Sequence, residues 1–266
     1  MRRRLLLCSL DGVRPDALAQ ATTPTIDALI ANGAYAPTAR SVMPSVTLPC
    51  HTSMLRGVDV PRHGITTNTF TPLARPVPSL LDVAATQGRR CGFFYNWEPL
   101  RDLAAPGSLA AGFYVADGFS PEGDREVARL AVEQCARQDI DTLFVYFGHP
   151  DEVGHKHGWM TQPYIDAISN ADTCLGIVID ALKATGHWEN TVTLVLSDHG
   201  GHERGHGTDS PEDMTIPWLL HGPGVKQGVT LSEEIRLFDT PSTLAHLLDL
   251  TPHHYWEGRV VTEALV

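Results

Sequence analysis

Three short apolar segments of this chain are each followed closely by an aspartate, and this repeated arrangement limits the folds open to it. The segments are residues 5–10, 141–147 and 191–197, and the aspartates that follow them are Asp11, Asp151 and Asp198. Nearly continuous apolar runs of this length, bounded by turn residues, are typical of strands buried on both faces of a parallel sheet. Because the carboxyl ends of parallel strands share one edge of the sheet, we expect the three carboxylates to meet there.

Helical patterns alternate with these strands. Residues 23–33 are typical of a helix, with Thr23 as its cap, Pro24 in its first turn and Gly33 just past its end. Further elements are expected as helices over 80–85, 122–137, 164–184 and 239–248, the last capped by Asp239, a helix starting near Pro49, and a strand over 91–95. The alternation predicts an α/β fold, a three-layer sandwich whose predominantly parallel central sheet has helices on both faces. We expect one domain over residues 1–266, without a large cap insertion.

Composition excludes several other classes of protein. Hydrophobic residues make up 42% of the 266 residues and charged residues 19%, as in ordinary globular proteins. The formal net charge of -11, without a long block of like charges, argues against nucleic acid as a scaffold partner. Five scattered cysteines without a Cys-x-x-Cys pair predict neither a disulfide framework nor a zinc–thiolate site. Since no run approaches the roughly eighteen apolar residues of a membrane span, we expect a cytoplasmic protein without a membrane partner.

The glycine-rich stretch 195–207 is the densest group of candidate metal ligands. It holds Asp198, His199, His202 and His206 directly after an apolar strand. Glycines let the backbone approach an ion closely, and neighbouring Asp and His side chains are good ligands. The alternative is a polar loop whose histidines are solvated.

Two other strand ends supply further candidates. Asp151 and His155 are four residues apart, which places them on the same face of one helical turn. Asp11 is either a third carboxylate of the same site or an ordinary turn aspartate. Gathered carboxylates repel one another unless cations neutralise them. Mixed Asp and His ligands favour Zn²⁺ or Mn²⁺ over Ca²⁺ or Mg²⁺, and the number of ligands suffices for two divalent ions.

Two further features bear on substrate binding. Thr47 lies just before the helix expected near Pro49, so it is either an N-cap or a hydroxyl at an anion-binding helix N-terminus. The aromatic residues of 93–97, which include Tyr95 and Trp97, either pack in the core, which is the favoured interpretation, or line a pocket.

Five short motifs, in order along residues 10 to about 206, resemble the alkaline phosphatase superfamily, and more narrowly its nucleotide pyrophosphatase/phosphodiesterase (type I phosphodiesterase) branch. They are Leu10-Asp11-Gly12, Pro44-Ser45-Val46-Thr47-Leu48-Pro49-Cys50-His51, His63-Gly64-Ile65 with Asn68, Asp151-Glu152-Val153-Gly154-His155, and Ser197-Asp198-His199-Gly200. The resemblance implies an alkaline phosphatase-like fold and a pair of zinc-type ions that act on a small phosphate ester, with a nucleotide among the candidates.

The resemblance also implies a role for each matching residue. Thr47 is the implied nucleophile, which would form a phosphothreonine intermediate, and Asn68 the implied donor to a phosphate oxygen, assisted by the Leu48 N–H. The implied ligands of one ion are Asp11, Thr47, Asp198 and His199, and those of the other are Asp151, His155 and a later histidine. His206 is our choice for that histidine, and His202 is the rival. Leu48, Tyr95 and Trp97 are the candidate substrate-pocket residues.

The match to the family has departures, and other functions remain open. Cys50 stands where the diesterase pattern usually has asparagine, and His51 stands where a sulfatase would have arginine. Phosphodiesters are the preferred substrates because a neutral donor such as Asn68 suits a singly charged group. The alternatives within the superfamily are a phosphomonoesterase, a phosphonate hydrolase or a metal-dependent phosphomutase. A non-catalytic protein that binds phosphate esters through metal is the alternative outside enzymes.

Overall fold

The computed structural model describes residues 2–73, 76–105 and 107–266 and has an eight-stranded sheet in the order β4-β3-β5-β1-β6-β7-β2-β8. The strands are β1 (Arg4–Leu10), β2 (Ala34–Arg40), β3 (Cys91–Tyr95), β4 (Leu109–Tyr114), β5 (Thr142–Phe147), β6 (Thr191–Leu196), β7 (Thr215–His221) and β8 (Val229–Thr230). Strand β7 runs antiparallel to its neighbours β6 and β2, whereas the other neighbouring strands pair in parallel. The predominantly parallel sheet that the sequence predicts is therefore confirmed.

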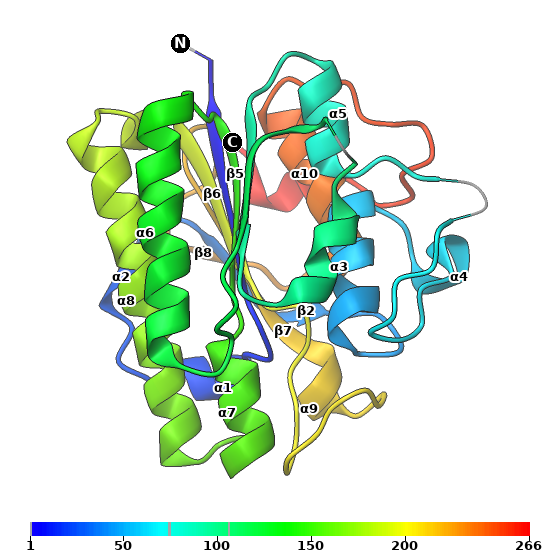
Figure 1. Ribbon diagram of the computed structural model, residues 1–266, viewed down its shortest axis with the longest axis vertical. Helices are drawn as coiled ribbons and strands as arrows, with labels where there is room; N and C mark the ends of the chain where they lie inside the picture. The colour runs from blue at the N-terminus through cyan, green and yellow to red at the C-terminus, as the bar shows by residue number, and fades with distance from the viewer. Residues whose placement is uncertain (1, 74–75, 106) are drawn as a thin grey trace.

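Helices cover both faces of this sheet. They are α1 (Pro15–Leu18), α2 (Pro24–Ala31), α3 (Thr47–Arg56), α4 (Val60–His63), α5 (Leu80–Thr86), α6 (Pro121–Gln138), α7 (His149–His157), α8 (Gln162–Ala184), α9 (Pro211–Met214) and α10 (Thr240–Leu247), with 3-10 turns at Glu98–Leu103, Trp188–Asn190, Leu237–Asp239 and Thr262–Ala264. Figure 1 shows α2, α6 and α8 on one side of the sheet and α3, α5 and α10 on the other. A separate cluster of buried apolar side chains fills the space on each side, which confirms the three-layer α/β sandwich.

The central strands bring the three predicted strand ends together. Strand β1 lies between β5 and β6, and its register pairs Leu10 with Phe147 and Ser9 with Leu196. All positions of β5 and β6 are buried, as their continuous apolar sequences predict. The carboxyl ends of three adjacent strands therefore lie level with one another at one edge of the sheet.

One helix boundary and one predicted cap contact differ from the sequence prediction. Helix α3 begins at Thr47 rather than near Pro49, and its N-cap is Val46. Helix α10 begins at Thr240 with Asp239 as its N-cap residue, as predicted, but the Asp239 carboxylate makes no capping hydrogen bond to α10. It accepts hydrogen bonds from the backbone N–H groups of Arg236 and Arg259 instead. In both cases a side chain typical of a helix cap is used for a contact outside its own helix.

Strands β2, β4 and β7 were not expected from the sequence, and their composition explains why. Proline and glycine are depleted in strand interiors, yet β2 contains Pro37, β4 contains Gly112 and β7 contains Pro217. The pairing of β2 with β7 shifts register between Ala36 and Ala39, around the proline that cannot donate a hydrogen bond. In the part of the chain that the structure describes, no helix is long and apolar enough to cross a membrane.

Candidate metal centre

One cluster of possible metal ligands lies deep at the ends of β1 and β6. It consists of Asp11, Asp198 and His199, whose ligand atoms all lie within 4.8 Å of one another. His199 Nε2 is 3.3 Å from Asp11 Oδ1 and 3.3 Å from Asp198 Oδ2. All three residues are buried, and we call them the deep group.

A second cluster lies beside it and is more open. It consists of Asp151 and His155 on α7 and His206 on the loop after β6, with ligand atoms again within 4.8 Å of one another. His155 Nε2 is 3.3 Å from Asp151 Oδ2 and 3.1 Å from His206 Nε2. The His155 side chain is 42% exposed, so solvent reaches this outer group. The rings of His199 and His206 stack with centroids 3.8 Å apart, which makes the two groups immediate neighbours.

The three imidazoles are held in the same way, through their Nδ1 atoms. The backbone acceptors are Gly200 O at 2.8 Å from His199, Arg204 O at 3.0 Å from His155 and Ser45 O at 2.8 Å from His206. Since a carbonyl oxygen only accepts, each Nδ1 carries the proton and donates it. The Nε2 lone pairs are then free for a metal ion, and such outer hydrogen bonds are typical of metal-ligating histidines.

The carboxylates are held at one oxygen while another is left without a partner. Tyr146 Oη donates to Asp11 Oδ2, and the Gly12 N–H donates to Asp198 Oδ1 at 3.2 Å. Asp11 Oδ1, Asp151 Oδ1 and Asp198 Oδ2 are buried without a hydrogen-bond partner among the described residues. Because a buried, unsatisfied carboxylate oxygen is costly, these atoms fit divalent metal ions at both groups.

The pKa shifts of the two carboxylates in the deep group also favour a bound cation. Burial, followed by the nearby Asp198 and Asp151 carboxylates, raises the pKa of Asp11 well above its ordinary value. Burial alone would also raise the pKa of Asp198, but the His199 and His51 imidazoles outweigh it and hold that pKa below its ordinary value. Carboxylates crowded in this way repel one another, and a cation between them would relieve the repulsion.

The structure places Thr47 against the deep group. It is the first residue of α3, is 3% exposed, and its Oγ1 is 3.2 Å from His199 Nε2. Asn68 is exposed nearby, and its Oδ1 accepts a hydrogen bond from the Leu48 N–H at 3.0 Å. The Leu48 N–H is thus directed at Asn68, and the amide nitrogen of Asn68 is the end available for an anionic ligand.

The remaining predicted residues, His202, Leu48, Tyr95 and Trp97, are not members of the two groups. His202 belongs to neither group, because its Nδ1 pairs with Asp213 Oδ1 at 2.7 Å and its side chain is 40% exposed. Leu48 and Tyr95 are buried in the core, and Trp97 is partly buried against it. These positions fit the packing interpretation of the aromatic segment better than an open pocket.

Sequence reasoning missed two residues that support the centre. Tyr146 lies inside β5 and donates to Asp11. His51 is fully buried one helical turn after Thr47, with its Nδ1 2.8 Å from Thr47 O and 3.3 Å from Asp198 Oδ2. The inward position of a polar ring in an apolar strand, and the four-residue spacing of His51 from Thr47, are the signals that could have identified them.

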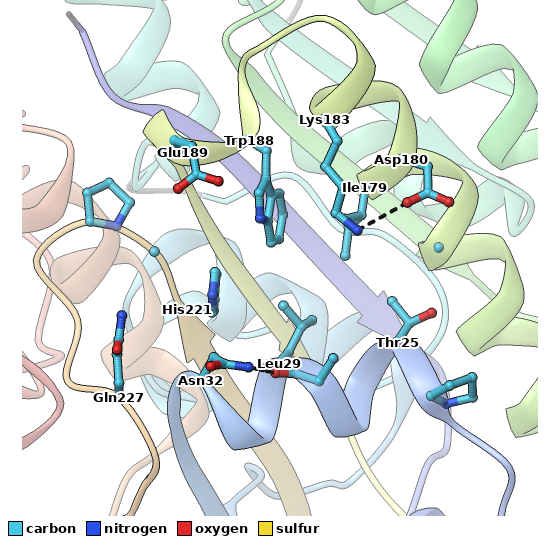
Figure 2. Close-up of a pocket in the computed structure, with 15 residues that line it drawn as sticks. Thr25, Leu29, Asn32, Ile179, Asp180, Lys183, Trp188, Glu189, His221 and Gln227 are labelled. Carbon is cyan, nitrogen blue, oxygen red and sulfur yellow. Dashed lines mark hydrogen bonds and ion pairs between the residues drawn. The ribbon is translucent and has the colours of Figure 1, made fainter.

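A separate pocket of about 640 Å³ is lined by residues of α2 and α8 and lies near the amino-terminal end of β6, whereas the metal groups lie at its carboxyl end. Figure 2 shows Trp188 and His221 in its middle and an ion pair between Lys183 and Asp180 at one side. Trp188 directly precedes β6, whereas Asp198 directly follows that strand. None of the residues that line this pocket is a predicted site residue.

Comparisons with known proteins show the family of the chain. The family model "Type I phosphodiesterase / nucleotide pyrophosphatase" matches residues 5–209. The chain is 24% identical over 219 residues to ectonucleotide pyrophosphatase/phosphodiesterase family member 7 of Rattus norvegicus, which covers 75% of this chain and 50% of the rat protein. It is also 35% identical over 127 residues to the 2,3-bisphosphoglycerate-independent phosphoglycerate mutase of Staphylococcus haemolyticus, which covers 47% of this chain and 24% of the mutase.

A solved structure shares the fold over nearly the whole chain. It is an inactive threonine-to-alanine variant of murine ectonucleotide pyrophosphatase/phosphodiesterase 5 in complex with AMP, with a TM-score of 0.81 and 20% identity, covering 99% of this chain and 100% of that one. This chain spans about half the length of the rat relative. Because the family model matches most of the sequence, the chain belongs to the type I phosphodiesterase/nucleotide pyrophosphatase family of the alkaline phosphatase superfamily.

Proposed function

We propose that this chain is a two-metal hydrolase of phosphate esters, with phosphodiesters as its preferred substrates and Thr47 as its nucleophile. The observation that carries the proposal is the position of the Thr47 hydroxyl, 3.2 Å from His199 Nε2 and beside two adjacent groups of metal ligands. The deep group, Asp11, Asp198 and His199, would hold one ion together with Thr47. The outer group, Asp151, His155 and His206, would hold the other. Zn²⁺ is the favoured metal, with Mn²⁺ as the alternative.

The chemistry of the ions follows from this ligand set. Divalent ions bound in the two groups would lower the pKa of the Thr47 hydroxyl and offset charge on the phosphoryl group. Thr47 gives up its hydroxyl proton to solvent, and its Oγ1 forms a bond to phosphorus while the bond from phosphorus to the leaving oxygen breaks. A phosphothreonine results. Water then attacks the phosphorus and releases Thr47, so that two displacements give net retention of configuration.

Asn68 would orient the substrate for this step. Its Oδ1 is engaged by the Leu48 N–H, so its Nδ2 can donate to a non-bridging phosphate oxygen. A neutral amide donor suits the single negative charge of a phosphodiester better than the double charge of a monoester. The AMP bound to the murine relative makes a nucleotide a reasonable candidate substrate for this chain as well.

The test is the loss of hydrolysis on removal of the Thr47 hydroxyl. With zinc saturating, Thr47→Ala should lower kcat for bis(p-nitrophenyl) phosphate on the order of 10³-fold or more, because nucleophile removal abolishes the covalent route. Thr52→Ala is the matched control, since Thr52 is a buried threonine of the same helix whose Oγ1 donates only to Leu48 O at 2.6 Å. Full activity of Thr47→Ala would reject the mechanism, and equal kcat/KM for p-nitrophenyl phosphate would reject the preference for diesters.

A phosphomutase is the second candidate. Of the two curated relatives described above, the staphylococcal phosphoglycerate mutase has the higher sequence identity to this chain, over a shorter aligned segment. Such an enzyme would also phosphorylate Thr47, but it would return the phosphate to another hydroxyl of the sugar or acid. Incubation with a phosphorylated sugar separates the two reactions, since a hydrolase releases inorganic phosphate and a mutase retains it on the product. Tight binding of phosphate esters without turnover would indicate a non-catalytic binding protein instead.

A further inference from the structure

Two buried polar side chains lie at the start of α7, the helix that carries Asp151 and His155 of the outer metal group. Asn96 directly follows β3 and is 2% exposed, and Asp124 is in the first turn of α6 and fully buried. Asn96 Nδ2 donates to Asp124 Oδ1 at 2.8 Å. Neither residue is a member of the deep group or of the outer group.

Both side chains reach the start of α7. Asn96 Oδ1 accepts a hydrogen bond from the N–H of Gly148, the N-cap of α7, at 3.1 Å. Asp124 Oδ1 accepts one from the N–H of His149, the first residue of α7, at 3.4 Å. The first N–H groups of a helix have no partner within it, and Gly148 has no side chain to supply one. A carboxylate at this end is also favoured by the helix dipole.

Helix α7 has little freedom to move at this end. A Cβ at Gly12 would lie 2.8 Å from Asp151 Oδ1 and 3.2 Å from Asp151 Cα, so the first turn of α7 is pressed against the end of β1. Gly12 has φ +67°, a conformation that also favours glycine. The carboxylate of Asp151 and the imidazole of His155, one turn later, are therefore placed by how the start of α7 is fixed.

We propose that Asn96 and Asp124 are positioning residues for the outer metal group, acting through the first turn of the helix that carries Asp151 and His155. The inference rests on the proposed role of that group in metal binding. Removal of either side chain leaves an N–H at the start of α7 without its acceptor and allows the turn to shift. Outer hydrogen-bond partners of this kind typically affect metal affinity by 10–100-fold.

The test is a zinc titration of metal-free protein in competition with a chromophoric chelator, with bound zinc counted by elemental analysis. Wild-type protein should bind two ions. Asp124→Ala and Asn96→Ala should bind one ion as before and the other roughly 10–100-fold more weakly. Asp124→Asn keeps an acceptor oxygen at the same position and should stay within a few-fold of wild type.

Asp172 offers a matched control. It is a carboxylate, 1% exposed, that accepts hydrogen bonds from the N–H groups of Thr25 and Ile26 at the start of α2. It lies on the same side of the sheet as α6 and belongs to neither metal group (Figure 1). Asp172→Ala should lower the Tm, as loss of a helix cap does, and leave both zinc affinities unchanged. A structural role alone would make Asp124→Ala behave in the same way.

A double variant identifies which ion is affected. His155→Ala removes a ligand of the outer group, so adding Asp124→Ala to it should cause little further loss of zinc affinity, whereas independent effects would add. Two ions bound by Asp124→Ala and Asn96→Ala with wild-type affinities would overturn the inference. So would an equal loss of zinc affinity in Asp172→Ala. Fewer than two ions on wild-type protein would instead contradict the proposed function.

Discussion

At the scale of single residues, the candidate ligands are defined by which atom of each is already engaged. Tyr146 donates to one oxygen of Asp11 and leaves Asp11 Oδ1 without a partner. The same division holds for the histidines, whose Nδ1 atoms are bound to backbone carbonyls. The protein thus supplies the orientation of the ligands before any ion binds, which lowers the entropic cost of metal binding.

We expect Tyr146→Phe to weaken zinc binding at the deep group by about 10-fold or more, because the Asp11 carboxylate loses the hydrogen bond that orients it. Tyr164→Phe is the control. Tyr164 is also fully buried, and its hydroxyl donates to the carbonyl of Gly12 at 2.7 Å rather than to a ligand side chain. Zinc titration of both metal-free variants would measure the difference, and an equal affinity of Tyr146→Phe and Tyr164→Phe for zinc would contradict the role assigned to Tyr146.

His63 should make stability depend on pH. It is buried, its Nδ1 accepts from the Ile65 N–H at 3.0 Å, and its Nε2 is 2.9 Å from Ser53 Oγ. Burial, and then the nearby Arg56 charge, lowers the pKa of His63 from 6.5 to about 4. Between these two pH values the unfolded chain binds a proton that the folded protein excludes, so the free energy of unfolding falls as the pH drops from about 6.5 to 4.

The expected loss is about 3 kcal/mol between pH 7.5 and 4, from 1.36 kcal/mol for each unit of pKa difference. His63→Asn keeps an acceptor for Ile65 but cannot take up the proton. The difference in unfolding free energy between wild type and His63→Asn, measured by urea denaturation, should therefore shrink as the pH falls. Other titrating groups contribute equally to both proteins, so a constant difference across this range would refute the assignment.

At the scale of elements, α3 connects the candidate nucleophile at its start to a left-handed glycine turn at its end. Gly57, which ends α3, has φ +64°, and a Cβ there would lie 2.9 Å from Cγ of Trp256. Trp256 cannot easily withdraw, since its Nε1 donates to Pro78 O at 2.9 Å. Gly64, at the end of α4, has φ +71° with nothing within 4 Å of its Cβ position.

Alanine substitutions at these two glycines distinguish two causes of lost stability, the positive φ that both share and the close contact with Trp256 that only Gly57 has. Gly64→Ala should lower the free energy of unfolding by about 1–2 kcal/mol, the cost of a left-handed conformation for a residue with a Cβ. Gly57→Ala has the same strain and in addition displaces Trp256, so it should lower the stability by roughly 1–3 kcal/mol more. Chemical denaturation of both variants measures the gap, and equal losses would show that Trp256 moves aside freely.

Elements whose signal is local could be predicted from the sequence. Strands β1, β5 and β6 are continuous apolar runs, and the four-residue spacing of Asp151 and His155 predicts their common helix face. The predicted start of α3 was wrong because threonine is a common N-cap residue. In the structure the N-cap is Val46, and the Thr47 side chain lies against His199. Strands β2 and β7 were missed because each contains a proline, which argues against a strand. The shift in register where the two strands pair accommodates the proline of β2, and this pairing cannot be read from the sequence.

At the scale of the whole molecule, the two metal groups exist only because three strands lie side by side and a later loop returns to them. The level ends of β5, β1 and β6 follow from parallel pairing, which the sequence predicts in general terms. Parallel pairing does not show whether His202 or His206 joins the outer group. His206 is held by the carbonyl of Ser45, a residue 161 positions away, and His202 by Asp213. Contacts of this range depend on the complete fold.

Metal binding should therefore stabilise the molecule as a whole. Zinc at about 100 times its dissociation constant should add roughly 2.7 kcal/mol for each ion, since only the folded chain brings the ligands together. For a chain of this size that corresponds to an increase in Tm of roughly 5–10 °C for each ion. Chelation of the metal should reverse the increase, and thermal unfolding with and without zinc measures it.

Substitution of His202 or His206 tests which of the two histidines binds the metal. His206→Ala removes a ligand of the outer group and should lose about half of the zinc-induced rise in Tm, because one of two ions no longer binds tightly. His202→Ala removes an exposed side chain that pairs with Asp213 and should keep the whole rise. The comparison uses the rise within each variant, so any loss of stability from the substitution itself cancels. A full rise in His206→Ala with a reduced one in His202→Ala would exchange the two assignments, and a full rise in both would remove His206 from the metal centre.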